Sequence, residues 1–208
     1  LENGGSLVRL ASVDPGTQVN ALGWSSNTAT FLTIAGTDSN IRMYRFVNNR
    51  PMVFENVRII LDTDLQFQEP VRMRGVCSLH GNGNFLDFSN GYSLYVESGG
   101  ELEFVNMYVK NYGVNGGQIF MADNTSKTTF VNSTVELTSN VYTHSGSVVC
   151  DGPNTFILKN YDWNFDYKGT LTVEHASLMV DNAQHEGLTT AGKIRFGKYN
   201  GGPGAQYL

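Results

Sequence analysis

The stretch from Ser93 to Lys110 alternates apolar and polar residues in three short runs. The runs are separated by Ser98-Gly99-Gly100 and by Asn106. Such a period of two is typical of half-buried strands, because successive side chains leave opposite faces of the backbone. Three strands this short cannot bury a core by themselves. We therefore expect the unit to repeat along the chain.

A three-residue motif at the end of the second run recurs along the chain. Its copies are Phe54-Glu55-Asn56, Phe104-Val105-Asn106, Phe130-Val131-Asn132 and Leu158-Lys159-Asn160. Spacings of 26 and 28 residues separate the last three copies. A period in the twenties, made of short strands and turns, predicts a solenoid whose coils stack at ~4.8 Å.

The repeat predicts where the equivalent positions of its copies lie in space. We expect the large apolar residues Phe54, Phe104, Phe130 and Leu158 to lie over one another. The amides of Asn56, Asn106, Asn132 and Asn160 would then hydrogen-bond along the axis, as amide ladders do. Alternatively, asparagine simply ends each strand as a turn former.

A glycine- and asparagine-rich turn supports the same fold through a resemblance. Gly81-Asn82-Gly83-Asn84 is followed by the strand pattern Phe85-Leu86-Asp87-Phe88. This segment is similar to the "G-N-G-x-x-L" turn of right-handed parallel β-helices in secreted and surface proteins of bacteria. Together with the repeated motif, the resemblance covers residues 51–182 and implies about five coils of such a helix. It names no activity.

The N-terminal region carries a second resemblance, to one blade of a WD-repeat propeller. The matching positions are Val19, Trp24-Ser25, Leu32, Gly36, Asp38, Ile41 and Tyr44. A propeller needs at least four blades and the likeness occurs once, so this chain cannot close one. We expect residues 1–50 to cap the first coil, or to pair with a neighbouring molecule by strand addition. Residues 183–208 are expected to form a last strand and a tail.

Composition fits an all-β protein and excludes some functions. The chain has 23 glycines among 208 residues and a net charge of −5. A negative net charge argues against binding nucleic acid through phosphate neutralisation. No run of about 18 apolar residues is present, so we expect no membrane span. The linker-like ends, LENGGS and GGPGAQYL, predict a segment cut from a longer precursor, although a cloned fragment would look the same.

The two cysteines are expected to stay apart. Cys77 and Cys150 are 73 residues apart, close to three coils. Three coils place equivalent positions ~14 Å apart, about twice the ~7 Å limit for a disulfide. We therefore expect two separate buried thiols.

The densest cluster of candidate binding residues lies at positions 160–167. In a strand, one face holds Tyr161, Trp163, Phe165 and Tyr167, and the other holds Asn160, Asp162, Asn164 and Asp166. The aromatic face either lies in the core or forms an exposed shelf that stacks on sugar rings or on a partner. The two aspartates are also weak candidates for Ca²⁺ ligands, but ~13 Å along a strand is too far for one ion without ligands from a neighbouring coil.

Other chemical signals are weaker. Asp62 and Asp64 share a strand face at ~7 Å, which is within the range for an inverting glycosidase pair. Two acids on a surface strand are more often simply solvated. His80, His144, His175 and His185 show no metal-ligand spacing, and no nucleophile elbow or phosphate-binding loop is present. We assign no catalytic residue and no cofactor.

Two functions from different classes follow. The first is a non-catalytic extracellular structural or adhesive segment at the cell surface, a self-assembling subunit of a fibre or filament. Its partners would be identical subunits and cell-surface glycans. The alternative is a polysaccharide lyase or hydrolase acting on acidic glycans, which rests on analogy of fold. Such an enzyme needs acids clustered with Arg or Lys, whereas the acids here are scattered along the chain, so we favour the structural function.

Overall fold

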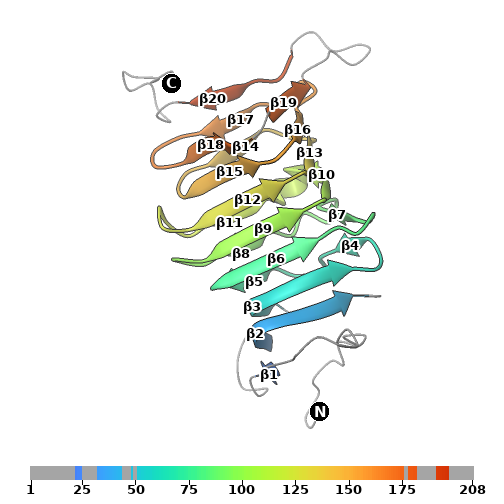
Figure 1. Cartoon of the computed structure of the whole chain (residues 1–208). Coiled ribbons are helices and arrows are strands. Elements are labelled where there is room, and N and C mark those ends of the chain that lie inside the picture. Colours follow the sequence, from blue (N-terminus) through green and yellow to red (C-terminus); the bar gives the residue numbers. More distant parts are fainter. Residues whose placement is uncertain are drawn as a thin grey trace.

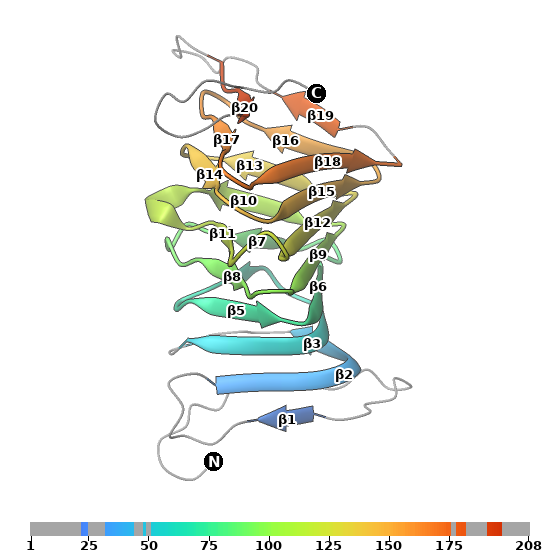
Figure 2. The same cartoon turned by 90° about the vertical axis from the view of Figure 1, so that its left-hand side faces the viewer.

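The computed structural model describes residues 22–24, 32–43, 48, 51–175, 178–181 and 191–196. These residues form β-strands that wind into a parallel solenoid, with the N-terminal strands at one end and the C-terminal strands at the other (Figures 1 and 2). The described part contains no α-helix, and its one helical element is the 3-10 turn η1 (Val114–Gly116). The prediction of an all-β parallel helix is confirmed.

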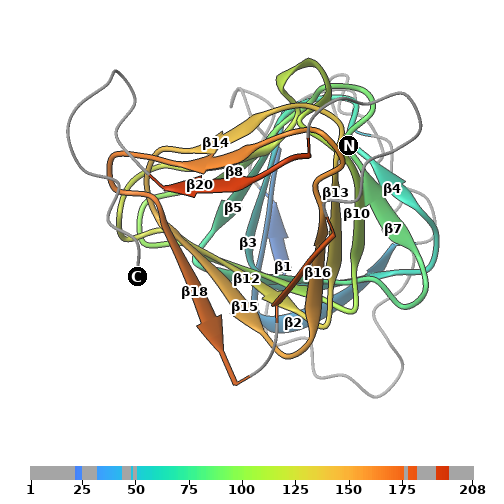
Figure 3. The ribbon, with the colours of Figure 1, turned by 90° about the horizontal axis from the view of Figure 1, so that it is seen from above.

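Each turn of the solenoid contributes one strand to each of three faces, which we call A, B and C (Figure 3). Face A holds β5 (Val71–Arg74), β8 (Leu94–Val96), β11 (Ile119–Met121), β14 (Val141–Thr143), β17 (Trp163–Phe165) and β20 (Ile194–Phe196). Face B holds β6 (Val76–His80), β9 (Glu101–Val105), β12 (Lys127–Val131), β15 (Ser147–Asp151) and β18 (Thr170–Glu174). Face C holds β4 (Leu65–Gln66), β7 (Phe85–Asp87), β10 (Tyr108–Tyr112), β13 (Thr134–Leu137), β16 (Asn154–Ile157) and β19 (Leu178–Asp181). The long strands β2 (Leu32–Met43) and β3 (Met52–Leu61) bend around the corner between faces A and B, and β1 (Leu22–Trp24) lies beside β2.

The winding is right-handed and has about six turns. Face C has six strands, one for each turn, which is one more than the five coils expected. In Figure 3 the chain passes from β12 to β13 to β14 anticlockwise as it rises toward the viewer. Right-handed crossovers are also the strong general preference for parallel strands.

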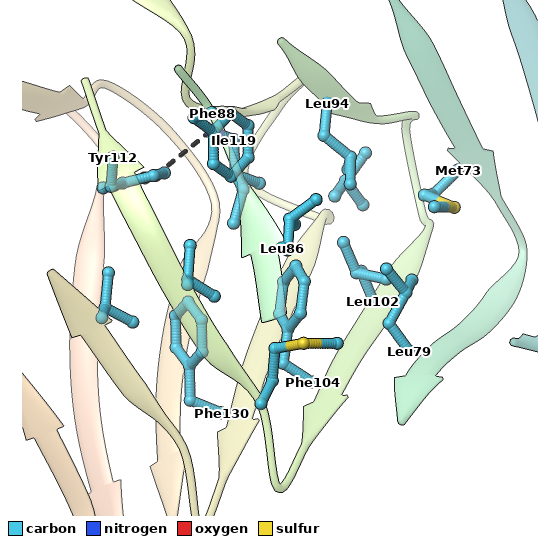
Figure 4. Packing of buried hydrophobic residues seen from close by; sticks show 14 of the residues in the cluster. Met73, Leu79, Leu86, Phe88, Leu94, Leu102, Phe104, Tyr112, Ile119 and Phe130 are labelled. Carbon is cyan, nitrogen blue, oxygen red and sulfur yellow. Dashed lines mark hydrogen bonds between the residues drawn. The ribbon is translucent and has the colours of Figure 1, made fainter. Parts of the chain in front are cut away.

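Columns of apolar side chains, one from each rung, fill the interior. On face B, Leu79 is in register with Phe104, and Phe104 with Phe130. The rings of Phe104 and Phe130 stack with their centroids 5.2 Å apart, and both residues are fully buried (Figure 4). Stacking of this kind adds about 0.5–1.5 kcal/mol to the burial itself. The expected superposition of these two phenylalanines is confirmed.

The other two members of the expected column lie elsewhere. Phe54 lies in the face A half of β3, where it is in register with Met73. Leu158 follows β16, in which Phe156 is the residue in register with Val135. The prediction was wrong for Phe54 and Leu158, because the same motif closes strands at different corners of the coil.

Left-handed residues turn the chain at these corners. Asn56, with φ of 53°, turns β3 from face A to face B, while Asn106 and Asn132, with φ of 50° and 49°, lead from face B to face C. Asparagine tolerates this conformation because its short side chain bonds locally. In the fourth copy Lys159, with φ of 57°, is the left-handed residue. Asn160 therefore does not hold the equivalent position that we expected.

Asparagine packs on glycine at two corners, in place of the expected amide ladder. Gly75 occupies the position of Asn56 in the next rung. Asn56 Oδ1 accepts a hydrogen bond from Val76 N at 3.0 Å. A Cβ atom on Gly75 would lie 2.1 Å from that oxygen. Likewise, a Cβ atom on Gly152 would lie 2.4 Å from Asn132 Oδ1. The side chains of Asn56 and Asn132 therefore require a glycine in the next rung.

The region that resembles a propeller blade forms the first rung of the solenoid. β2 pairs in parallel with β3, so that Ile34 is in register with Phe54 and Ile41 with Ile59. A blade is an antiparallel sheet, and among the described strands only β1 is antiparallel to its neighbour. The WD-blade resemblance therefore does not extend to the structure. Three of its positions, Val19, Ser25 and Tyr44, lie outside the described residues.

The two cysteines are free and buried, as expected. Cys77 is in register with Leu102 on face B, whereas Cys150 is in register with Phe130 in a different column. Burial raises the pKa of both thiols, to about 12 for Cys150. A protonated, buried thiol is chemically inert.

Candidate functional site

The C-terminal end of the solenoid exposes residues that belong to interior columns. β18, β19 and β20 form its last described rung (Figures 1 and 2). Three side chains lie in register with buried residues of the preceding rung: Val173 with Cys150, Val180 with Phe156, and Phe196 with Phe165. Their exposed fractions are 45%, 38% and 40% respectively. The apolar columns of the described rungs thus continue to this end and stay partly exposed there.

The last described rung also ends the backbone ladders. Within the described part of the chain, β18, β19 and β20 are each the last strand of their ladder. Such an edge presents N–H and C=O groups that can pair with another strand. The N-terminal end differs, because Ile34, Ile41 and Met43 of the first rung are only 2–4% exposed. In the described part of the chain, the first rung is therefore buried and the last rung is partly exposed, and we call these the closed end and the open end.

The four aromatic residues of positions 161–167 differ in their burial. Trp163 and Phe165 are 1% and 2% exposed and stack on each other with their ring centroids 5.6 Å apart. Tyr161 is partly buried against the core, and Tyr167 is 64% exposed. The core interpretation therefore holds for the centre of this segment. The four residues do not form an exposed shelf, because the interior face of β17 points into the solenoid.

The two aspartates of this segment have separate partners. Asp162 accepts hydrogen bonds from Arg195 Nε at 2.5 Å and from Lys193 N at 2.9 Å, both near β20. Asp166 lies at the corner between faces A and B, where its Oδ1 is 2.5 Å from His144 Nδ1. Among the described residues, no group of three or more His, Cys, Asp or Glu side chains could hold a metal ion.

Asp166 and His144 belong to a small polar and aromatic cluster on the surface, which we call the A/B corner cluster. Its described members are Tyr142, His144, Asp166 and Tyr167. The ring of His144 lies nearly parallel to that of Tyr142, with centroids 5.8 Å apart, and is edge-on to that of Tyr167 at 5.9 Å. Two neighbouring rungs supply the cluster, β14 with the residue after it and the turn after β17.

The candidate acid pair Asp62 and Asp64 is engaged in bonds between rungs. Asp62 accepts two hydrogen bonds from Arg42, at 2.8 Å from Nε and at 2.5 Å from Nη2. These bonds lower the pKa of Asp62 against the opposing effect of burial. Asp64 Oδ1 accepts a hydrogen bond from Phe85 N at 3.2 Å. Both aspartates therefore link neighbouring rungs.

The other histidines do not converge. His80 Nε2 is 3.1 Å from Ser78 Oγ, and burial together with the charge of Arg58 lowers the pKa of His80. His175 is highly exposed near Asp151, at 3.7 Å. His185 lies outside the described residues.

A hollow of about 410 Å³ lies on the outer side of face B. Charged residues from three rungs line it, namely Arg58, Glu101, Glu103 and Lys127. Glu101 is paired with Lys127 at 2.9 Å. The sequence analysis missed this grouping because it treated the acids as scattered. Stacking of the rungs brings Glu103 within reach of the same hollow as Arg58, although 45 positions separate them in the chain.

Comparison with known proteins gives no relative. The scan against protein-family models, the search of curated proteins and the search of solved structures each returned no match.

The described residues include no helix that is both long and apolar enough to pass through a membrane.

The A/B corner cluster was also missed from the sequence. His144 and Asp166 are 22 residues apart, which is one turn of the solenoid, and they meet because β14 pairs in register with β17. Only the rung length could have signalled the pair. That length varies along the chain, so the register at this corner could not be read from the repeat.

Proposed function

We propose that this protein is a non-catalytic structural segment of an extracellular surface, and that it self-associates through its C-terminal rung. The single observation that carries the proposal is the open end formed by β18, β19 and β20. Val173, Val180 and Phe196 continue interior columns there and remain 38–45% exposed. Burying such apolar area contributes about 25 cal/mol for each Å² removed from water.

A second copy of the chain is the occupant that fits this end. Its last rung has the same shape and the same apolar columns. Its strands could also pair with those of the first copy at the usual distance of about 4.8 Å between hydrogen-bonded strands. Since the N-terminal end is closed, the contact that the burial pattern favours joins two C-terminal rungs about a two-fold axis. Growth into a fibre would further require β1 to leave the edge of β2, which opens the first rung for head-to-tail stacking.

Sedimentation velocity over a range of protein concentrations tests this proposal. The wild-type chain should form a dimer or larger species, while Val173→Glu should remain a monomer because a carboxylate would be buried in the interface. Val76→Glu is the matched control. Val76 is 65% exposed on the side of the solenoid, so this variant should assemble like the wild type.

Two results would contradict the proposal. A wild-type chain that stays monomeric at every concentration leaves no role for the open end. Equal loss of assembly in Val76→Glu and Val173→Glu would place the contact on the side of the solenoid.

The hollow on face B supports a second candidate, an enzyme that acts on acidic glycans. Arg58 offers a guanidinium for a carboxylate, and Glu103 lies in the same hollow. Incubation with polygalacturonate, followed by analysis for released oligosaccharides, tests this alternative. Release that disappears in both Arg58→Ala and Glu103→Gln would support the enzyme and overturn the non-catalytic function.

A further inference from the structure

The A/B corner cluster contains a buried carboxylate that is held against a half-exposed imidazole. The side chain of Asp166 is 5% exposed and that of His144 is 51% exposed. Asp166 Oδ2 is buried and accepts no hydrogen bond from the part of the chain that the structure describes. A buried carboxylate oxygen without a donor is costly. Within the described chain, the contact with His144 is the one side-chain interaction of this carboxylate, so its role there is to hold His144 in place.

The bond to Asp166 fixes what His144 offers to a ligand. In the neutral imidazole, an acceptor at Nδ1 assigns the proton to that nitrogen. The other nitrogen, Nε2, is then a hydrogen-bond acceptor on the same half-exposed ring. An acceptor of this kind pairs with a hydroxyl donor.

Tyr167 supplies a second, independent observation. Its φ is 51°, a left-handed conformation that is an outlier for a bulky residue, and its side chain is 64% exposed. Glycine or asparagine would adopt this backbone at lower cost. An exposed aromatic side chain in a strained position, beside an oriented histidine, is better explained by a binding role than by packing.

We propose that the A/B corner cluster is a carbohydrate-binding site, in which a sugar ring packs on Tyr167 and one of its hydroxyl groups donates to His144 Nε2. A pyranose has both required features, an apolar face of C–H groups and a rim of hydroxyls. Asp166 acts as a positioning residue, and Tyr142 supports the imidazole from its other side. The site lies on the side of the solenoid, so it does not depend on assembly through the C-terminal rung.

The experiment is a calorimetric titration of the full chain with soluble β-glucan, mannan, galactan and polygalacturonate. The wild-type chain should bind at least one of these glycans. Tyr167→Asn should weaken that binding about tenfold or more, which corresponds to about 1.4 kcal/mol. His144→Phe, which keeps a ring on Tyr142 but removes the acceptor, should weaken it to a similar extent.

Stability measurements separate binding from folding. Since asparagine accommodates the left-handed backbone, Tyr167→Asn should unfold at the same denaturant concentration as the wild type or at a higher one. Tyr95→Asn is the matched control, because Tyr95 lies on the same face A as Tyr142, two rungs before it, and packs on Phe120. It should lose stability and keep its affinity for the glycan.

Three results would overturn the proposal. They are no binding to any of the four glycans, binding that Tyr167→Asn leaves unchanged, and a Tyr167→Asn variant that unfolds much more easily than the wild type. The last result would make Tyr167 a structural residue.

Discussion

Phe130 and Phe196 are both phenylalanines that continue interior columns, but they lie in two regions of the solenoid with different surroundings. Phe130 lies in a central rung, is fully buried, and stacks on Phe104 below it. Phe196 lies in the last described rung, stacks on Phe165 below it, and is 40% exposed. Each has a neighbour on one side. Among the described residues, only Phe130 has a neighbour on its other side as well, namely Cys150.

This difference shows that a rung cannot complete its own core. In a solenoid each repeat contacts only the repeats before and after it, so stability is a sum of terms between neighbours. A central rung is stabilised by two such interfaces with neighbouring rungs, and an end rung by one. The two ends therefore differ in how the apolar side of the end rung is treated: it is buried at the closed N-terminal end and partly exposed at the open C-terminal end.

The largest expected effect comes from truncating the two phenylalanines. Phe130→Ala should reduce the free energy of unfolding by about 3–5 kcal/mol, because it leaves a cavity between two rungs. Phe196→Ala should cost about 1 kcal/mol, because part of the side chain is already in water. Denaturant unfolding measures both values. Equal losses would mean that the last rung is covered on both sides.

A smaller effect should separate two glycines with the same backbone conformation. Gly152 and Gly99 have φ of 73° and 68°, but a Cβ atom would meet Asn132 Oδ1 at 2.4 Å in the first case and nothing within 4 Å in the second. Alanine at either position pays about 1–2 kcal/mol for the left-handed backbone. Gly152→Ala should cost more than Gly99→Ala, as measured by thermal or denaturant unfolding.

A second substitution tests the cause of that excess. Asn132→Gly keeps the left-handed corner and removes the side chain that the new Cβ atom would strike. In the Gly152→Ala background it should recover the excess over Gly99→Ala. If the double variant gains nothing, the contact between Asn132 and Gly152 does not determine the cost.

The smallest expected effect concerns pH at the closed end. Arg42 in the first rung lowers the pKa of Asp62 below its usual value of 3.8. A lowered pKa in the folded state contributes stability above the unfolded pKa, and that stability is lost as pH falls through the folded value. Stability should therefore decline below about pH 3.8, by about 1 kcal/mol for this partly buried pair. Asp62→Asn should remove this contribution and make the profile between pH 2 and pH 5 flatter, as unfolding at each pH will show.

The sequence predicted the architecture well because the period of two and the period in the twenties are local signals. Strands around Phe104 and Phe130 were placed in register by their own motif, and the separation of Cys77 from Cys150 followed from counting coils. The motif failed at Phe54 and Leu158 because three different corners, from face A to B, from B to C and from C to A, use the same turn chemistry. A left-handed residue marks a corner, but it does not say which one.

The candidate sites were harder to predict because they depend on register between rungs. The alternation of positions 161–167 correctly placed Trp163 and Phe165 on the inner face. It could not show that the strand ends at Phe165, which leaves Tyr167 in the following turn and in solvent. The meeting of His144 with Asp166 depends on the length of one coil. No residue within either segment encodes that length.

The position of Trp163 gives the molecule an internal optical probe of its open end. The indole is 1% exposed, donates a hydrogen bond to Thr143 Oγ1 at 3.0 Å, and lies one rung below Ile194 in β20. Detachment of that final strand would bring water to the ring and shift its emission to longer wavelength, while the central rungs stayed intact. With Trp24, the other tryptophan of the chain, replaced by phenylalanine, the colour of the emitted light alone would report whether the end is frayed, closed or joined to a partner.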